Sequence, residues 1–232
     1  MASENQIIIA AKCAPDGAIL GSIGEAGLGA VELYTGKAHL SRASDIVRIC
    51  SGFPFRYAVH APNEGEDWKS LAEVVNMLEA EIVVFHNIYW EDEWERILRA
   101  FEGTHARLCM ENTHSVLEPL KFMKRYALGM CMDMEHLQIE CAGYFEDGAL
   151  PFVKMASHIH MTGYTFGSRM WHTHLHHSPG HCFHLLETAV QAGFSGMVVS
   201  EAKVSLQTLS EFKALCSFAE EWREREHSGF ML

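Results

Sequence analysis

Patterns typical of buried β-strands alternate with patterns typical of α-helices along this whole chain of 232 residues. Strands are predicted at residues 7–11, 30–34, 56–62, 81–86, 107–112, 127–136, 157–160 and 196–201. Helices are predicted at 18–28, 39–51, 67–80, 91–102, 116–126, about 137–156, 183–192 and 206–226. Strands that alternate with helices pair in parallel, and eight such units predict a (β/α)₈ TIM barrel, with residues 1–232 as one domain.

An open, doubly wound sheet is the alternative arrangement of the same elements. It is disfavoured because no G-x-G-x-x-G phosphate loop follows the first strand. In a TIM barrel the functional side chains project from the C-terminal ends of the strands. Those strand ends are therefore where candidate site residues are expected.

Six consecutive strands, from the third onward, end in side chains that can bind a metal. These are His60, His86, Glu111, Asp133 with His136, His160 and Glu201. In the sixth strand, the period of two places Cys131 and Asp133 on the inner face and Met130 and Met132 on the outer face. Buried carboxylates and imidazoles are costly unless a cation compensates them. The series therefore predicts a metal site at the C-terminal end of the barrel.

The residue types narrow the choice of metal. Carboxylates and imidazoles without thiolates favour Mn or Zn, and are also compatible with Fe or Co. The three carboxylates Glu111, Asp133 and Glu201 carry enough charge to hold one divalent ion. A second ion would depend on the histidines and a bridging hydroxide, so one or two ions per chain are expected.

Other polar residues allow two interpretations each. Glu32 faces inward by its position in the second strand, and either orients a metal ligand or takes part in an ion pair. Arg169, in the Gly/His/Ser/Thr-rich segment 161–181, either binds a substrate phosphate or carboxylate or lies exposed. His158 is expected to be a buried core histidine.

Composition limits the partners. The formal charge of −12 argues against a nucleic acid or an anionic membrane as partner. No apolar run approaches the ~20 residues of a membrane span, and the polar start does not resemble a signal peptide. The seven cysteines lack regular spacing and are expected to be reduced. A cytoplasmic protein with a small-molecule substrate is expected, and its oligomeric state is left open, a homodimer included.

Short motifs throughout the chain resemble those of the xylose-isomerase-like barrel superfamily, which includes sugar isomerases, sugar epimerases and endonuclease IV. The motifs are Val59-His60-Ala61-Pro62, Val84-Phe85-His86, Met110-Glu111-Asn112, Cys131-Met132-Asp133-Met134-Glu135-His136, His158-Ile159-His160 and Ser200-Glu201-Ala202. The segment Trp171-His172-Thr173-His174, followed by Gly180, is similar to the Asp-x-His loop of that superfamily.

The resemblance implies roles for these residues. In the sugar epimerases, one metal ion would be held by the residues equivalent to Glu111, Asp133, His160 and Glu201. Glu111 and Glu201 would then donate and accept protons, and His136 would bind a substrate oxygen. Substrate contacts are also expected from His60, His86 and Arg169.

In endonuclease IV a three-zinc cluster would add His60, His86, His136, His172 and His174. His172 stands where that superfamily has Asp, which removes a negative charge and favours a mono- or dinuclear site. The loop after His60 is acidic and lacks the aromatic or basic residues that would wedge into a duplex, so DNA is not expected as a substrate.

Three functional hypotheses follow. The first is a metal-dependent isomerase or epimerase of a small sugar or sugar-like hydroxy-ketone, in which glutamates transfer a proton through a metal-stabilised enediolate. The second is a di- or trinuclear zinc hydrolase, a phosphoesterase acting on a small substrate. The third is altered chemistry, such as a metal-dependent lyase or oxygenase, or a barrel without catalysis. Neither the substrate, the native metal nor a lid role for 161–181 can be identified from the sequence.

Overall fold

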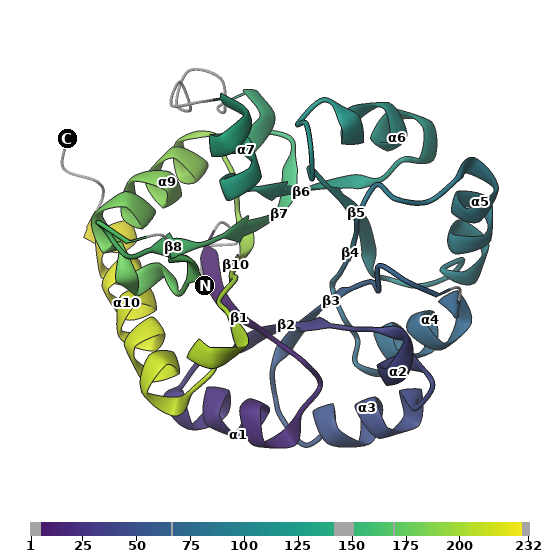
Figure 1. Cartoon of the computed structure of the whole chain (residues 1–232), viewed down its shortest axis with the longest axis horizontal. Helices are drawn as coiled ribbons and strands as arrows, with labels where there is room; N and C mark the ends of the chain where they lie inside the picture. The colour runs from purple at the N-terminus through teal and green to yellow at the C-terminus, as the bar shows by residue number, and fades with distance from the viewer. Residues whose placement is uncertain (1–5, 66, 142–150, 169, 229–232) are drawn as a thin grey trace.

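Eight parallel strands form a closed ring in the computed structural model, which describes residues 6–65, 67–141, 151–168 and 170–228 (Figure 1). The barrel strands are β1 (Ile7–Cys13), β2 (Ala30–Tyr34), β3 (Arg56–His60), β4 (Ile82–Phe85), β5 (Arg107–Glu111), β6 (Gly129–Asp133), β7 (Ala156–Met161) and β10 (Gly196–Ser200). Pairing of β1 with β10, from Ile7–Gly196 to Ala11–Ser200, closes the ring. The predicted (β/α)₈ TIM barrel is therefore confirmed.

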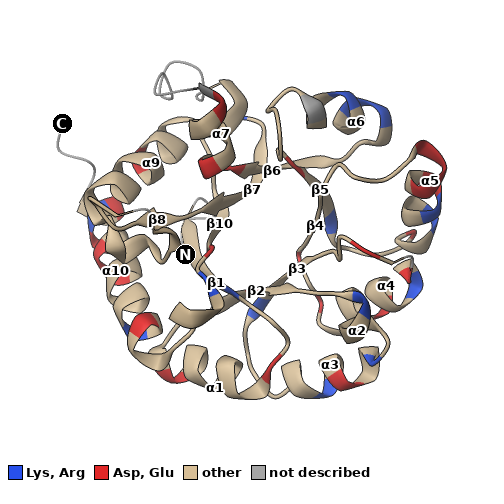
Figure 2. Cartoon of the chain, viewed as in Figure 1, with Lys and Arg blue, Asp and Glu red and all other residues tan. Residues whose placement is uncertain are grey.

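Helices surround the ring of strands. They are α1 (Gly17–Ala26), α2 (Lys37–Leu40), α3 (Ala43–Cys50), α4 (Trp68–Met77), α5 (Glu91–Ala100), α6 (Glu118–Tyr126), α7 (Met134–Cys141), α9 (Pro179–Gln191) and α10 (Leu209–Ser228). Asp67 begins α4 as predicted, because its Oδ1 accepts a hydrogen bond from the Ser70 amide at 3.1 Å. Most Lys, Arg, Asp and Glu residues lie on these outer helices and their loops (Figure 2).

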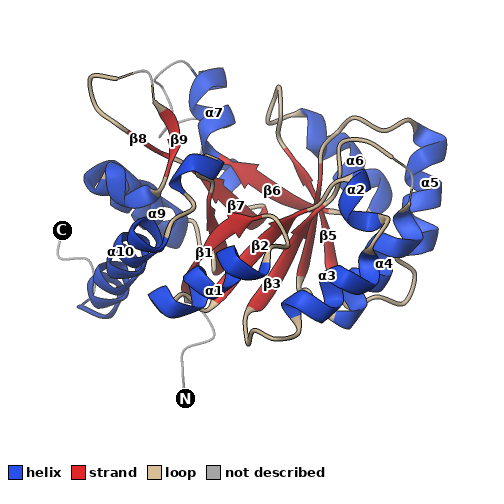
Figure 3. Ribbon diagram, turned by 60° about the horizontal axis from the view of Figure 1, so that its bottom comes forward, coloured by secondary structure: helices blue, strands red, loops and turns tan. Residues whose placement is uncertain are grey.

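Three segments differ from the prediction. The strand expected over 127–136 ends at Asp133, because the Asp133 carboxylate accepts from the His136 amide at 2.8 Å and α7 begins at once. The helix expected over 39–51 is divided into α2 and α3. The loop expected over 161–181 contains the antiparallel pair β8 (Gly163–Tyr164) and β9 (Trp171–Thr173), which lies apart from the barrel strands (Figure 3), and the 3₁₀ helix η1 (Leu175–His177). Residues 142–150 of the expected helix to 156 lie outside the described residues.

Large apolar side chains lie between the strands and the helices, and small ones fill the barrel. Trp94, Trp222, Phe85 and Phe212 are fully buried in the main core cluster. The interior contains two small clusters instead, made of Ala10, Ala30, Ala58, Met197 and Val199, and of Val84, Cys109 and Cys131. An eight-stranded barrel is just wide enough for side chains to fill. The polar side chains at the strand ends therefore rest on a dry, compact layer.

The pairing of β6 with β7 contains one register shift. Cys131 pairs with His158 and Asp133 with His160, whereas Ser157 has no partner in the ladder. Because successive side chains of a strand point to opposite faces, this extra residue decides which side chains of β7 face inward. The shift brings both histidines to the inner face beside Cys131 and Asp133.

The described residues bear on two expectations from composition, namely the expected lack of membrane-spanning helices and the expected reduced cysteines. No helix in this part of the chain has the length and apolar character needed to cross a membrane. The described cysteines Cys13, Cys50, Cys109, Cys131, Cys182 and Cys216 are free and buried.

Candidate active site in the barrel mouth

Each of the eight barrel strands contributes one ionisable side chain to a ring near the C-terminal end of the barrel. We call this ring the mouth: Lys12, Glu32, His60, His86, Glu111, Asp133, His160 and Glu201. A cavity of about 360 Å³ lies in the mouth, lined by Lys12, His60, His86, Glu111, His136 and Glu201 among others. A larger cavity of about 610 Å³, lined by Lys37, Asn63 and Tyr89 among others, contains none of the predicted site residues. The predicted site residues therefore gather around the smaller cavity.

Three imidazoles converge on one carboxylate oxygen of Glu111. Glu111 Oε2 lies 3.1 Å from His60 Nε2, 3.3 Å from His86 Nε2 and 3.4 Å from His160 Nδ1. Burial by itself raises the pKa of Glu111, but the charge of His160 and hydrogen bonds from the imidazoles outweigh burial and hold the pKa well below its ordinary value. We refer to His60, His86, Glu111, Asp133 and His136 as the histidine side of the mouth.

The contacts of His60 favour a cation between this ring and Glu111. His60 Nδ1 lies 3.0 Å from the Ala61 carbonyl oxygen, which can only accept, so Nδ1 carries the proton. Burial lowers the pKa of His60, which favours the neutral ring. In the neutral ring the lone pair of Nε2 then faces the Glu111 carboxylate at 3.1 Å. Two lone pairs facing each other at this distance repel, and a metal ion bound by both relieves the repulsion.

Asn112 joins the ends of β5 and β6. Its side-chain amide donates to the Asp133 carbonyl at 3.0 Å, and its Oδ1 accepts from the Asp133 amide at 2.7 Å. His136 Nδ1 donates to the Asn112 carbonyl at 2.8 Å, which leaves Nε2 as the free acceptor of that ring. Burial, together with the charges of Glu201 and Glu111, raises the pKa of Asp133 to about 7. Among the described residues, no Lys or Arg pairs with Asp133, whose Oδ2 lies 3.7 Å from His136 Nδ1.

The opposite side of the mouth has a cation of its own. Lys12 Nζ contacts Glu201 Oε1 and lies 3.0 Å from Glu32 Oε1. Burial by itself lowers the pKa of Lys12, but the charges of Glu201, Glu32 and Glu111 outweigh burial and hold the pKa above its ordinary value. For Glu201 burial raises the pKa, and Lys12 and His160 together hold it well below its ordinary value. We refer to Lys12, Glu32, His160 and Glu201 as the lysine side.

Lys12 was missed by the sequence analysis. The first strand was predicted to end at Ala11, whereas β1 continues to Cys13. Extending the alternation of Ile8 and Ala10 by one step would have placed Lys12 on the inner face. A lysine after an apolar run normally indicates that a strand has reached the solvent.

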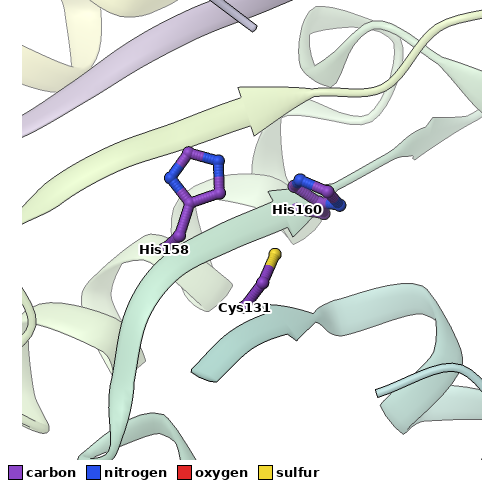
Figure 4. Close-up of side chains that lie close together, drawn as sticks. All are labelled: Cys131, His158 and His160. Carbon is purple, nitrogen blue, oxygen red and sulfur yellow. The ribbon is translucent and has the colours of Figure 1, made fainter. Parts of the chain in front are cut away.

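Glu32 fixes the orientation of His160. Its Oε2 accepts from His160 Nε2 at 3.0 Å and from His158 Nε2 at 2.8 Å. His160 Nδ1 is therefore left facing the mouth, 3.0 Å from Glu201 Oε1. Figure 4 shows His158 one step deeper on the same strand, and Cys131 of β6 pointing toward His160. His158 is fully buried, as expected of a core residue, and both interpretations offered for Glu32 describe contacts that it makes.

Two predicted site residues have polar contacts with residues outside the ring of strand-end side chains, and a third is not described. His174 is fully buried, with Nδ1 3.0 Å from Ser200 Oγ and Nε2 3.2 Å from the Leu206 carbonyl oxygen, so both ring nitrogens have partners outside the mouth. His172 Nε2 lies 3.6 Å from Glu135 Oε2, at a position where the backbone φ is 54°. Arg169 lies outside the described residues.

The remaining donors fit a divalent metal ion. In the described part of the chain, three groups within the mouth have possible ligand atoms less than 4.8 Å apart: His60, His86 and Glu111; Glu111, Asp133 and His136; and Glu32, His160 and Glu201. The four ligands implied by the resemblance are divided between the last two groups. Because His160 Nδ1 lies 3.4 Å from Glu111 and 3.0 Å from Glu201, it connects the two sides.

Comparisons with known proteins agree with this geometry at the level of the fold. No protein-family model matches the chain, and no curated protein matches it. A xylose isomerase domain protein from Planctomyces limnophilus has a TM-score of 0.67 at 12% identity, covering 96% of this chain and 98% of that chain. D-allulose 3-epimerase from Methylomonas sp., in complex with D-allulose, has a TM-score of 0.63 at 12% identity, covering 97% and 99%. An L-ribulose 3-epimerase has a TM-score of 0.60 at 11% identity, covering 98% and 99%. The chain therefore has the fold of the xylose-isomerase-like barrels that its motifs resemble.

Proposed function

We propose that this chain is an enzyme, a divalent-metal-dependent isomerase or epimerase of a small sugar or sugar-like hydroxy-ketone. The observation that carries the proposal is the convergence of two buried carboxylates on one imidazole. Glu111 ends β5 and Glu201 follows β10; both line the cavity and lie 3.4 and 3.0 Å from His160 Nδ1. Structural similarity to D-allulose and L-ribulose 3-epimerases supports the choice of a sugar.

The residues that would hold the ion are Glu111, Asp133, His160 and Glu201. Manganese and zinc suit this set of three carboxylates and one imidazole. A divalent ion would supply the positive charge that an enediolate requires. The cavity of about 360 Å³ is in the lower part of the range for small-molecule sites.

The side chains divide the proton transfer between them. One glutamate removes the proton from the carbon next to the carbonyl, and the other returns a proton to the opposite face or to the neighbouring carbon. His136 offers Nε2 to a substrate oxygen, because its Nδ1 is bonded to Asn112. His60 and His86 line the cavity and would contact the rest of the substrate.

Isotope exchange tests the proposal directly. Protein purified without chelators would be incubated with Mn²⁺ and a panel of ketoses in D₂O, and ¹H NMR would follow deuterium entry at carbon. We expect exchange into at least one ketose, and a loss of about 10³-fold or more in each of Glu111→Gln and Glu201→Gln. Glu95→Gln, on the exposed face of α5, is the matched control. Absence of exchange from the whole panel would overturn the proposal.

A second candidate function is a zinc phosphoesterase acting on a small substrate. The observation that favours it is the approach of His60 and His86 to Glu111 Oε2, because an epimerase does not need these histidines as metal ligands. Two or more zinc ions per chain, together with hydrolysis of p-nitrophenyl phosphate or its diester, would support this candidate. About one ion per chain and no hydrolysis would exclude it.

A further inference from the structure

The positive charge in the mouth is unevenly distributed. Four carboxylates lie there (Glu32, Glu111, Asp133 and Glu201), and Lys12 supplies the ammonium. Its contacts are with Glu201 and Glu32, on the lysine side. On the histidine side, Glu111 Oε2 faces the imidazoles of His60 and His86 at 3.1 and 3.3 Å.

The ammonium of Lys12 lies where a second metal ion would bind. Glu32, His160 and Glu201 have possible ligand atoms within 4.8 Å of one another, which is the arrangement a cation needs. Lys12 Nζ contacts Oε1 of both glutamates. The other oxygen of Glu32 accepts from His158 and His160. A second metal ion that used Glu32 would therefore have to take Oε1, the oxygen that the ammonium contacts, whereas Glu201 still has its Oε2 for the ion bound with Glu111.

Displacing the ammonium would be costly. The Lys12 side chain is only 16% exposed, so an ammonium separated from both carboxylates would remain largely out of water. Breaking a buried pair by removing one partner leaves an uncompensated charge, which is strongly destabilising. A metal ion added beside the ammonium would meet its repulsion in a region of low dielectric constant.

The charge balance leads to the same conclusion. When ionised, the four carboxylates carry −4 and Lys12 carries +1, so the ammonium already offsets part of the negative charge that a second divalent ion would otherwise offset. Without Lys12 the net charge would be −4, which two divalent ions neutralise. Lys12 thus makes a second ion unfavourable.

We propose that Lys12 acts as a built-in cation on the Glu32–His160–Glu201 group and limits the mouth to a single divalent metal ion, bound with Glu111. This inference deepens the proposed function and rests on it, because it takes the Glu111 carboxylate as the place where that ion binds. A mouth limited to one ion suits proton transfer between carbons and disfavours hydrolysis by two metal ions.

Counting bound ions in lysine variants tests the inference without an activity assay. Chelator-stripped protein would be titrated with Mn²⁺ by calorimetry, and Zn²⁺ would be counted by elemental analysis after gel filtration. We expect about one ion per chain in the native chain and about two in Lys12→Met and Lys12→Gln, because the neutral side chains free the Oε1 atoms. Lys203→Met, which removes an exposed lysine near the mouth, is the matched control and should leave the count at one. An unchanged count in both Lys12 variants would overturn the inference.

The outcomes separate this inference from the proposed function. If the native chain binds no ion, the metal-dependent function fails and the single-ion limit fails with it. If all variants bind one ion, only the inference fails. Two ions in the native chain would also overturn the inference. If circular dichroism shows that neither Lys12 variant folds, the ion count of the native chain alone decides whether the inference stands.

Discussion

On the histidine side of the mouth Glu111 faces three imidazole nitrogens, whereas on the lysine side Glu201 contacts an ammonium. The two sides belong to one barrel and both contact His160, and the ammonium of Lys12 in β1 lies on the lysine side. The pKa of Asp133 is raised to about 7 by burial and neighbouring carboxylates, whereas that of Glu201 is held well below its ordinary value despite burial. The comparison shows which buried carboxylates need an external cation and which have one in the chain.

The largest effect is expected from Glu111→Gln, which removes the carboxylate oxygen that three imidazoles approach. We expect activity to fall by about 10³-fold or more and metal affinity by about 10²-fold, because the neutral amide provides neither the charge nor the base. Isotope exchange and calorimetry would measure the two losses, with Glu95→Gln as the control. Retained metal binding would show that the lysine side alone can hold the ion.

His174→Gln provides a reference outside the mouth. Burial and the charge of His176 lower the pKa of His174 from 6.5 to about 4, so between these values the unfolded chain binds more protons than the folded chain. Stability is therefore complete above pH 6.5 and lost as the pH falls toward 4, by about 3 kcal/mol. Urea unfolding of the variant across this range should show a shallower loss, with the metal count unchanged. A lowered metal count would instead place His174 among the ligands.

Removal of the metal should affect the two sides unequally. When the free metal concentration is about 100 times the dissociation constant, the bound ion adds about 2.7 kcal/mol to the free energy of unfolding. Chelation should remove this contribution from the native chain and more from Lys12→Gln, which we expect to hold a second ion. Thermal unfolding with and without chelator measures the loss of stability in the native chain and in Lys12→Gln. Equal losses in the two proteins would contradict the expected second ion in Lys12→Gln.

The smallest expected effect is that of Glu32→Gln. Glu32 orients His160 and is not part of the histidine side. Loss of such an orienting carboxylate typically lowers metal affinity by about 10–100-fold. Calorimetry with Mn²⁺ would measure the change, and Glu32→Asp should recover part of it. Unchanged affinity would mean that the two sides bind independently.

The alternation of strand and helix patterns was sufficient to predict the barrel and most of its mouth. The ends of six strands were found because each apolar run stops at a His, Asp or Glu. These positions depend on local periodicity, which the sequence displays directly.

The remaining features depend on pairings between distant residues. Lys12 was missed because a lysine becomes tolerable in a barrel only beside carboxylates such as Glu32 and Glu201. His136 was placed on a strand because the helix-capping role of Asp133 competes with its apparent place in the strand pattern. His174 was grouped with the metal ligands, although its ring nitrogens contact Ser200 and the backbone of Leu206.

The unpaired Ser157 in β7 determines which side chains of that strand face the barrel interior, and so how this interior could change during evolution. With a regular ladder, Cys131 would pair with Ser157 and Asp133 with Ile159, and both histidines would point toward the surrounding helices. A regular ladder that kept Ser157 would therefore exchange an imidazole pair for a hydroxyl and a hydrocarbon, with every side chain of the sequence kept. In this barrel, a shift in strand register can abolish a function that no substitution elsewhere had touched.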